Sequence, residues 1–325
     1  MTSHPHDALF KSSLTPDAAL ALCRAVLPPE VSARFAGAEL SPVPVTFIEP
    51  SLSEVRSDVC YSAKVGGAEA LVYVLTEHQS SVDPLMAFRV LRYMTDLWTW
   101  WLGRQEGNPA TLPLVIPIVV YHGERAWSAA QSFQDLIESP LGGTARTFVP
   151  DFRYQLDDLP QRSEADLRAR QAPAHAVVSW IFLRSSHAPD RGIEVWRRCH
   201  DLLEAVAAQP EWKTLLEGLV SYSLVRGLGT TDELRSELRS LGGAEAEEVA
   251  VTEGERLLER GREQGRDQCL LEGERNVLRL QLRKQFGLEA LPEEVEQRIK
   301  LATAAQLDVW AERVLDAATL AGIFE

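Results

Sequence analysis

Three side chains, those of Asp58, Glu77 and Gln79, have the types and spacing that would suit a divalent cation. Asp58 lies near the start of one predicted strand, and Glu77 and Gln79 lie at the end of the next. An antiparallel hairpin would therefore bring the two carboxylates together. Because side chains alternate along a strand, Glu77 and Gln79 face one way and His78 faces the other. The backbone carbonyl of His78 is then available beside the carboxylates.

Such a site suits a hard cation, Mg²⁺ or Mn²⁺, which takes oxygen ligands from carboxylates, waters and substrate phosphates. The expected metal ligands are Asp58, Glu77 and the backbone carbonyl of His78, and Gln79 would orient the attacking water. The ion would polarise the scissile phosphate and lower the pKa of that water. The spacing alone leaves a second interpretation open, in which Asp58 and Glu77 are only solvated strand ends.

Hydrophobic periodicity predicts the hairpin that must position these residues. Residues 56–65 alternate between apolar and polar types, as a half-buried strand does. Two glycines at positions 66 and 67 predict a tight turn. Residues 70–78 are almost continuously apolar up to their end, which is typical of a strand buried on both faces. The open end of this hairpin would carry the metal site.

Other elements are predicted on both sides of the hairpin, in an order that indicates an α/β fold. Within the first of them, Thr15-Pro16-Asp17 resembles a helix N-terminus. The predicted elements are a helix at residues 5–26, an edge strand at 43–48, a helix at 84–102, and strands at 114–121 and 152–156.

A change in composition near residue 241 predicts three parts. Residues 1–240 would form the α/β domain, with a second helical layer that contains Trp180, Trp196 and Trp212. Residues 241–275 predict a charged helical connector with repeated glycines, each of which costs about 1 kcal/mol in a helix interior. Residues 276–325 predict a small helical domain, and we expect a homodimer through these C-terminal helices.

The overall composition narrows the class of protein. The net charge of −14 over 325 residues argues against a passive nucleic-acid coat, because DNA-binding surfaces gather basic residues. Four separated cysteines without a CxxC pair predict neither a zinc site nor a disulfide framework, and favour a reducing cytoplasm. No apolar run is long enough for a bilayer and no secretory signal is evident, so we expect a cytoplasmic protein without membrane contact.

Several blocks resemble, in order and spacing, the Rpn family of recombination-promoting nucleases, the YhgA-like proteins long labelled transposases. The likeness spans about residues 4–240. The blocks are His-Asp-Ala-Leu-Phe-Lys at 6–11, Arg-Ser-Asp-Val-Cys-Tyr at 56–61, Thr-Glu-His-Gln-Ser-Ser at 76–81, Met-Ala-Phe-Arg-Val-Leu-Arg-Tyr-Met at 86–94, Pro-Ile-Val-Val-Tyr-His-Gly at 117–123 and Phe-Arg-Tyr-Gln-Leu-Asp-Asp-Leu at 152–159. The tail at 278–295 resembles a small uncharacterised helical domain that often accompanies such proteins.

This resemblance implies the restriction-endonuclease-like, or PD-(D/E)xK, fold, a mixed β-sheet flanked by helices. It also implies Mg²⁺-dependent DNA cleavage with a link to recombination or mobile elements. Asp58 matches the aspartate of the motif and Glu77 its second acidic position. Gln79 replaces the lysine of the wider superfamily. Since a neutral amide stabilises developing negative charge less well, either the nuclease is slower or Gln79 only positions water.

Three further residues are weaker candidates for the same site. Asp7 lies on the first predicted helix, where the superfamily often supplies another acidic ligand, although it could instead cap the helix. Lys11 could contact phosphate or be an ordinary solvated lysine. Asp158 follows a predicted strand and is either a metal or supporting group or an aspartate at the entry to a loop.

Three functions therefore compete. The first is a DNA endonuclease, and the second is a catalytically weakened nuclease fold that acts as a DNA- or protein-binding module. A true transposase is the third, but the Glu-x-Gln hairpin argues against it, because those enzymes place their acidic residues on separated elements of a different fold. DNA is the expected partner in the first function.

Overall fold

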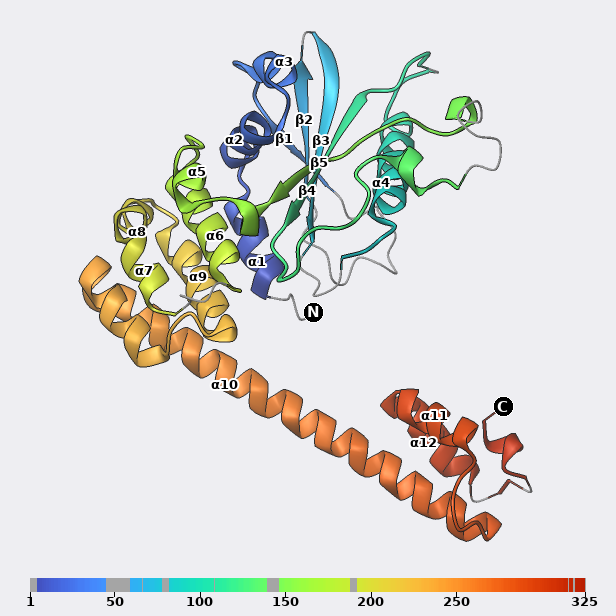
Figure 1. The fold of residues 1–325 in the computed structure, drawn as a ribbon. Coiled ribbons are helices and arrows are strands. Elements are labelled where there is room, and N and C mark those ends of the chain that lie inside the picture. The colour runs from blue at the N-terminus through green and yellow to red at the C-terminus, as the bar shows by residue number, and fades with distance from the viewer. Residues whose placement is uncertain are drawn as a thin grey trace. The chain divides into compact units, whose positions relative to one another are not determined.

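A computed structural model describes residues 5–44, 59–65, 67–77, 82–107, 109–138, 146–187, 192–314, 316–317 and 319–324 (Figure 1). The chain divides into two compact units, Met1–Gly254 and Glu255–Glu325. The first unit contains a five-stranded sheet with helices on both faces, and the second is helical. The expected α/β class is confirmed for the first unit.

The strands form one mixed sheet whose spatial order equals their order along the chain. They are β1 (Ser41–Val43), β2 (Val59–Val65), β3 (Ala68–Glu77), β4 (Leu114–Tyr121) and β5 (Gln155–Asp158). β1, β2 and β3 pair antiparallel, whereas β3, β4 and β5 are parallel. The predicted hairpin of β2 and β3 is confirmed, with Val59 opposite Val74.

β3 is buried on both faces, as its continuous apolar run predicts. Val72 and Val74 belong to the core on one face, and Leu71, Tyr73 and Leu75 belong to the core on the other. β4 alternates in the same way and matches the predicted strand at residues 114–121. Parallel strands covered by helices on both sides need apolar residues at every position, so the sequence signal is strong here.

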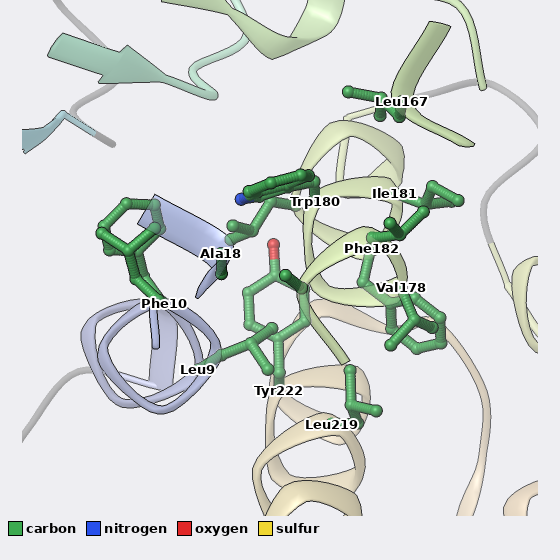
Figure 2. Close-up of a cluster of buried hydrophobic side chains, with 14 of the residues drawn as sticks. Leu9, Phe10, Ala18, Leu167, Val178, Trp180, Ile181, Phe182, Leu219 and Tyr222 are labelled. Carbon is green, nitrogen blue, oxygen red and sulfur yellow. The ribbon is translucent and has the colours of Figure 1, made fainter. Parts of the chain in front are cut away.

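One face of the sheet carries a thick helical layer built from distant parts of the chain. This layer contains α1 (Pro5–Ser13), α2 (Pro16–Val26), α6 (Ala174–Ser185) and α9 (Trp212–Arg226). Figure 2 shows Leu9 of α1 and Trp180 of α6 in one cluster with Tyr222 of α9. Trp180 and Trp196 are fully buried in this layer, and Trp212 is partly buried against the same core.

The single helix predicted at residues 5–26 is wrong, because α1 and α2 are separate. Thr15 has extended backbone angles (φ −69°, ψ 166°) and its side chain accepts a hydrogen bond from the Ala18 N–H as an N-cap. Pro16 favours this break, since the residue before a proline avoids the helical region. The Tyr61 hydroxyl donates to the Leu14 carbonyl, so the break is also tied to β2.

The other face carries a thinner layer, formed by α4 (Met86–Leu102) and the segments around it. Figure 1 shows α4 on the side of the sheet opposite α1 and α6. The C-terminal part of α4 is tied to the sheet by two indoles. Trp98 donates to the Pro113 carbonyl at 2.9 Å, and Trp101 donates to Glu69 Oε2 at 2.7 Å. This helix matches the one predicted at residues 84–102.

The two short strands differ from their predictions. β1 covers Ser41–Val43, and most of the edge strand predicted at residues 43–48 lies outside the described residues. β5 begins at Gln155 instead of residue 152, because Arg153 forms an isolated bridge to Ser132. The remaining elements of the first unit include α3 (Pro29–Ser32), η1 (Ala33–Phe35), η3 (Phe133–Leu136), η5 (Leu159–Gln161), α5 (Glu164–Arg168), α7 (Glu194–Arg198) and α8 (His200–Ala207).

The second unit has its own small core, which includes Leu278, Leu282 and Ile299. Its elements are the C-terminal part of α10 (Thr231–Phe286), α11 (Glu293–Leu301), α12 (Ala304–Arg313) and η6 (Ala321–Ile323). Gly287, at φ +61°, follows the end of α10, where glycine is common because it adopts this left-handed conformation without strain.

α10 is a long helix that passes from the first unit into the second. Gly242 and Gly243 interrupt its helical geometry. The predicted boundaries at residues 240 and 275 both lie within this helix, and they stay predictions, as does the homodimer. Among the helices that the structure describes, none has the length and apolar character that a membrane span requires.

Candidate active site

The ends of the three parallel strands lie side by side at one edge of the sheet, which we call the rim. Glu77 is the last residue of β3 and pairs with Tyr121, the last residue of β4. Tyr121 in turn pairs with Asp158, the last residue of β5. Neighbouring strands are about 4.8 Å apart, so about 10 Å separates the Cα atoms of Glu77 and Asp158.

Of the predicted metal ligands, only the backbone of Glu77 is described. Asp58, His78 and Gln79 lie outside the described residues. In the chain, Asp58 directly precedes β2, whereas His78 and Gln79 directly follow β3. The first residue of β2, Val59, pairs with the β3 residue three positions before Glu77. The described ends of the hairpin are therefore where the sequence places the carboxylate pair.

The two candidates on the first helix have a different setting. Asp7 and Lys11 belong to α1, which packs against α6 and α9 in the thick layer. Lys11 is exposed. The predicted contact of Lys11 with phosphate and the predicted metal contact of Asp7 stay predictions.

Asp158 is the last residue of β5 and the N-cap residue of η5, so both interpretations of this aspartate stay open. Its Oδ1 is buried and has no hydrogen-bond partner among the described residues. Burial raises the pKa of Asp158, and the neighbouring Asp157 raises it further. Hydrogen bonds from the backbone of Gln161 and Trp127 and the charge of Arg162 lower this pKa, but burial prevails. The carboxyl group thus lacks a full complement of positive partners.

Asp157 has the opposite environment, although it is the preceding residue. Its side chain is fully buried, and Arg170 donates to its two oxygens at 2.7 Å each. Arg162 adds a third contact at 3.2 Å, and the Arg170 guanidinium lies 4.9 Å from the Trp180 ring centroid. This ion pair fastens β5 to the thick layer. The sequence does not single out Asp157, because only strand alternation distinguishes it from Asp158.

The end of β4 is shaped by a tyrosine that folds over a glycine. The Tyr121 hydroxyl donates to the Arg125 carbonyl at 2.6 Å, and its ring packs edge-on against Trp127 at 4.9 Å. A Cβ atom on Gly123 would clash with that hydroxyl oxygen and with the Tyr121 ring. Only glycine fits without displacement, so this turn is a constrained part of the rim. His122 is fully buried between these two residues in the chain.

The chemistry of the available donors fits a hard cation better than zinc. Burial raises the pKa of the Cys23, Cys60 and Cys199 thiols to about 12 each, so they offer no thiolate ligands at neutral pH. In the described residues, no group of three or more histidine, cysteine or acidic residues could hold a metal. The buried Oδ1 of Asp158 is an oxygen acceptor without a donor, which suits an ion with oxygen ligands.

Comparison with known proteins agrees with the blocks found in the sequence. A family model described as "Putative transposase, YhgA-like" matches residues 4–213. The chain belongs to this YhgA-like family. The matched region contains all five strands, and therefore the whole rim, and it ends at the start of α9.

Named relatives of this YhgA-like chain come from Escherichia coli. Recombination-promoting nuclease RpnD of strain O157:H7 is 37% identical over 131 residues, which are 39% of this chain and 50% of the relative. Recombination-promoting nuclease RpnA of strain K12 is 37% identical over 123 residues, 38% of this chain and 41% of the relative. Inactive recombination-promoting nuclease-like protein RpnE of the same strain is 37% identical over 124 residues, 38% and 40% respectively. The matches thus span half or less of each relative, and no solved structure matches.

Proposed function

We propose that this protein is a metal-dependent DNA endonuclease with the PD-(D/E)xK fold, acting in recombination or on mobile elements. One observation carries the proposal. The β2–β3 hairpin ends with Glu77 at the rim, and Asp58 directly precedes its other strand. The nuclease names of RpnD and RpnA support the reaction type.

In the proposed site, Asp58, Glu77 and the His78 carbonyl would hold the cation, Mg²⁺ or Mn²⁺. The bound ion supplies positive charge that polarises the phosphate and acidifies a water. Gln79 orients that water for attack on phosphorus. The water oxygen forms a bond to phosphorus, one phosphorus–oxygen ester bond breaks, and the leaving oxygen takes up a proton. The products are one phosphate monoester end and one hydroxyl end.

A second candidate is a binding module that keeps the fold but has lost activity. The name of RpnE, which contains the word inactive, favours this alternative for at least one relative. Gln79 also favours this alternative, because it stands where the wider superfamily has lysine. A Gln79→Lys variant separates the two functions, because a working nuclease with a weak third position is expected to gain activity.

The direct test incubates the purified full chain with supercoiled plasmid, with and without Mg²⁺ or Mn²⁺. We expect cleavage only with metal, and we expect Glu77→Gln and Asp58→Asn each to reduce the rate at least 100-fold, since each removes a metal ligand. Circular dichroism must show that the variants stay folded. A variant that carries both substitutions and still cleaves at the rate of the natural sequence would refute the proposal.

A further inference from the structure

A pocket of about 530 Å³ opens beside β2, at the end of the β2–β3 hairpin that is farthest from the rim. It lies just beyond the last residue pair of β1 and β2, which is Ser41 opposite Ser62. If β1 continued in the same register, Glu39 would pair with Lys64, but no backbone hydrogen bond joins these two among the described residues. Both residues line the pocket instead. The pocket therefore occupies the place of a missing continuation of β1.

The chain that leads into β1 is anchored to the core instead of to β2. Leu40 is 8% exposed and belongs to the core of the thick face, and Ala38 packs against the same core. Gly37 has a φ of +74°, a left-handed conformation that glycine adopts without strain, so the chain can turn sharply here. The gap beside β2 is thus a stable feature of the fold.

The hairpin register determines which way the backbone of Lys64 points. Val65 pairs with Ala68 across a two-residue turn, and the residues that flank such a turn exchange backbone hydrogen bonds with each other. Hydrogen-bonded and non-hydrogen-bonded pairs alternate along an antiparallel ladder. Ala63 therefore bonds to Ala70, whereas Lys64 turns its N–H and C=O away from β3. These two groups point to the side of β2 on which the pocket lies.

The pairing of β1 agrees with this alternation. Pro42, which has no N–H to donate, lies opposite Tyr61, where the alternation leaves no hydrogen bond between the two strands. Ser62 faces β1 and pairs with Ser41. Lys64 is the next residue that faces this side, and in the part of the chain that the structure describes no backbone group bonds to it from there. An open donor and acceptor at a sheet edge are a template for another strand.

The charged side chains of the pocket differ in how they are compensated. Lys64 and Glu69 lie directly opposite each other on β2 and β3, and a sheet favours such a pair of opposite charges. Glu69 also accepts the hydrogen bond from Trp101. Glu39 is exposed and forms no ion pair with any residue that the structure describes. A basic group brought into the pocket would give this carboxylate a partner.

We propose that this pocket binds an extended segment of a partner protein, which adds to the sheet beside β2 and brings a basic side chain to Glu39. One residue of the segment donates its N–H to the Lys64 carbonyl and accepts a hydrogen bond from the Lys64 N–H. In this mode of recognition the main chain supplies affinity and the side chains supply specificity. The volume lies within the range of about 300–1,000 Å³ that is usual for ligand pockets. The inference uses no residue of the rim, so it is independent of the proposed nuclease activity.

Two proline substitutions test the direction of the Lys64 backbone. Lys64→Pro removes an N–H that faces the pocket, so the ladder between β2 and β3 is expected to survive and the melting temperature to fall by only a few degrees. Ala63→Pro removes the N–H that bonds to Ala70 and should lower the melting temperature by roughly 10 °C. If Lys64→Pro is as damaging as Ala63→Pro, the Lys64 N–H does not face the pocket and the proposal is refuted.

Fluorescence polarisation then measures how the full chain binds a fluorescein-labelled peptide, Lys-Val-Thr-Val-Lys with blocked ends. We expect Lys64→Pro to weaken binding about 10-fold through the lost hydrogen bond, and Lys64→Ala, which keeps the N–H, to bind like the natural sequence. Glu39→Gln should weaken binding about 3-fold, as an exposed ion pair allows. Glu30→Gln is its control, because it removes the same charge from an exposed position on α3.

Three outcomes would overturn the proposal. The first is that the natural sequence does not bind the peptide at concentrations up to about 1 mM, which would mean that the pocket holds only water. The second is equal binding by Lys64→Pro and Lys64→Ala, since the backbone would then play no part. The third is tighter binding of the acidic peptide Glu-Val-Thr-Val-Glu, which would contradict the role of Glu39.

Discussion

Helical layers of different thickness cover the two faces of the sheet, and an aspartate has different surroundings on each face. The thick face is sealed by α1, α2, α6 and α9, whereas α4 and its flanking segments cover the thin face. Strand alternation places Asp157 on the thick face and Asp158 on the thin one. The first is locked between arginines, and the second keeps an oxygen without a partner. Adjacent residues of one type thus have opposite electrostatic surroundings.

The largest expected difference comes from removing each aspartate in turn. Asp157→Ala leaves the Arg170 guanidinium, whose side chain is 5% exposed, buried without its carboxylate. Breaking such a pair typically lowers the free energy of unfolding by about 3–5 kcal/mol. Asp158→Asn is expected to lower it by less than about 1 kcal/mol. Urea unfolding of both variants measures the contrast, and equal losses would mean that the two faces do not differ in this way.

A second substitution tests how tightly the thin face is packed at the rim. Gly123→Ala would place a methyl group against the Tyr121 ring and force that ring to move. We expect a loss of about 1–3 kcal/mol in the free energy of unfolding. Gly103→Ala is the control, because its new Cβ would meet atoms no closer than 3.6 Å. If Gly123→Ala leaves the free energy of unfolding unchanged, the turn has more space around Gly123 than the structure shows.

A third change tests a single hydrogen bond on each face. Tyr61→Phe removes the hydroxyl that donates to Leu14 on the thick face, and Tyr154→Phe removes the donor to Ala130 at 3.0 Å on the thin face. Burial raises the pKa of both phenols to about 12, so both are donors at neutral pH. The free energy of unfolding of each variant should fall by about 1 kcal/mol. Thermal unfolding measures both, and a loss in Tyr61→Phe alone would mean that only the thick face depends on such ties.

The smallest expected effect is a pH dependence in the thick layer. Burial lowers the pKa of His175, whose Nε2 lies 3.3 Å from Thr15 Oγ1. The unfolded chain then binds the proton more readily, so stability is full above the unfolded pKa of about 6.5 and falls as the pH drops below it. His175→Gln should reduce this dependence of the free energy of unfolding on pH, which urea titrations at a series of pH values would measure. Substitution of the half-exposed His200 is the control, and an equal flattening there would contradict the assignment.

The sequence predicts the sheet best where burial is two-sided and worst where contacts are distant. β4 was predicted to the residue, because parallel strands leave an uninterrupted apolar run. Thr15 and Pro16 indicate a helix start, but the sequence does not show that another helix, α1, ends just before them. The break between the two helices depends on Tyr61, 47 positions away in the chain.

The strand ends are predictable from residue types, but the contacts around them are not. Polar residues that end apolar runs indicate Glu77 and Asp158 as strand ends, and both end their strands in the structure. The partner of Asp157, Arg170, lies 13 positions along the chain and pairs with it through the tertiary fold. No spacing rule connects these two residues, so the sequence could not show which of the two aspartates was already neutralised.

The packing of α1 against α9 has a consequence for how the chain is made. The apolar surface of Leu9 and Phe10 leaves the ribosome well before Leu219 and Tyr222, which cover part of it. Until then the nascent chain must carry uncovered helices, a state in which aggregation begins. A fragment cut at residue 213, where the family match ends, would keep every strand and lose this cover. The shortest version worth expressing therefore extends to Gly254.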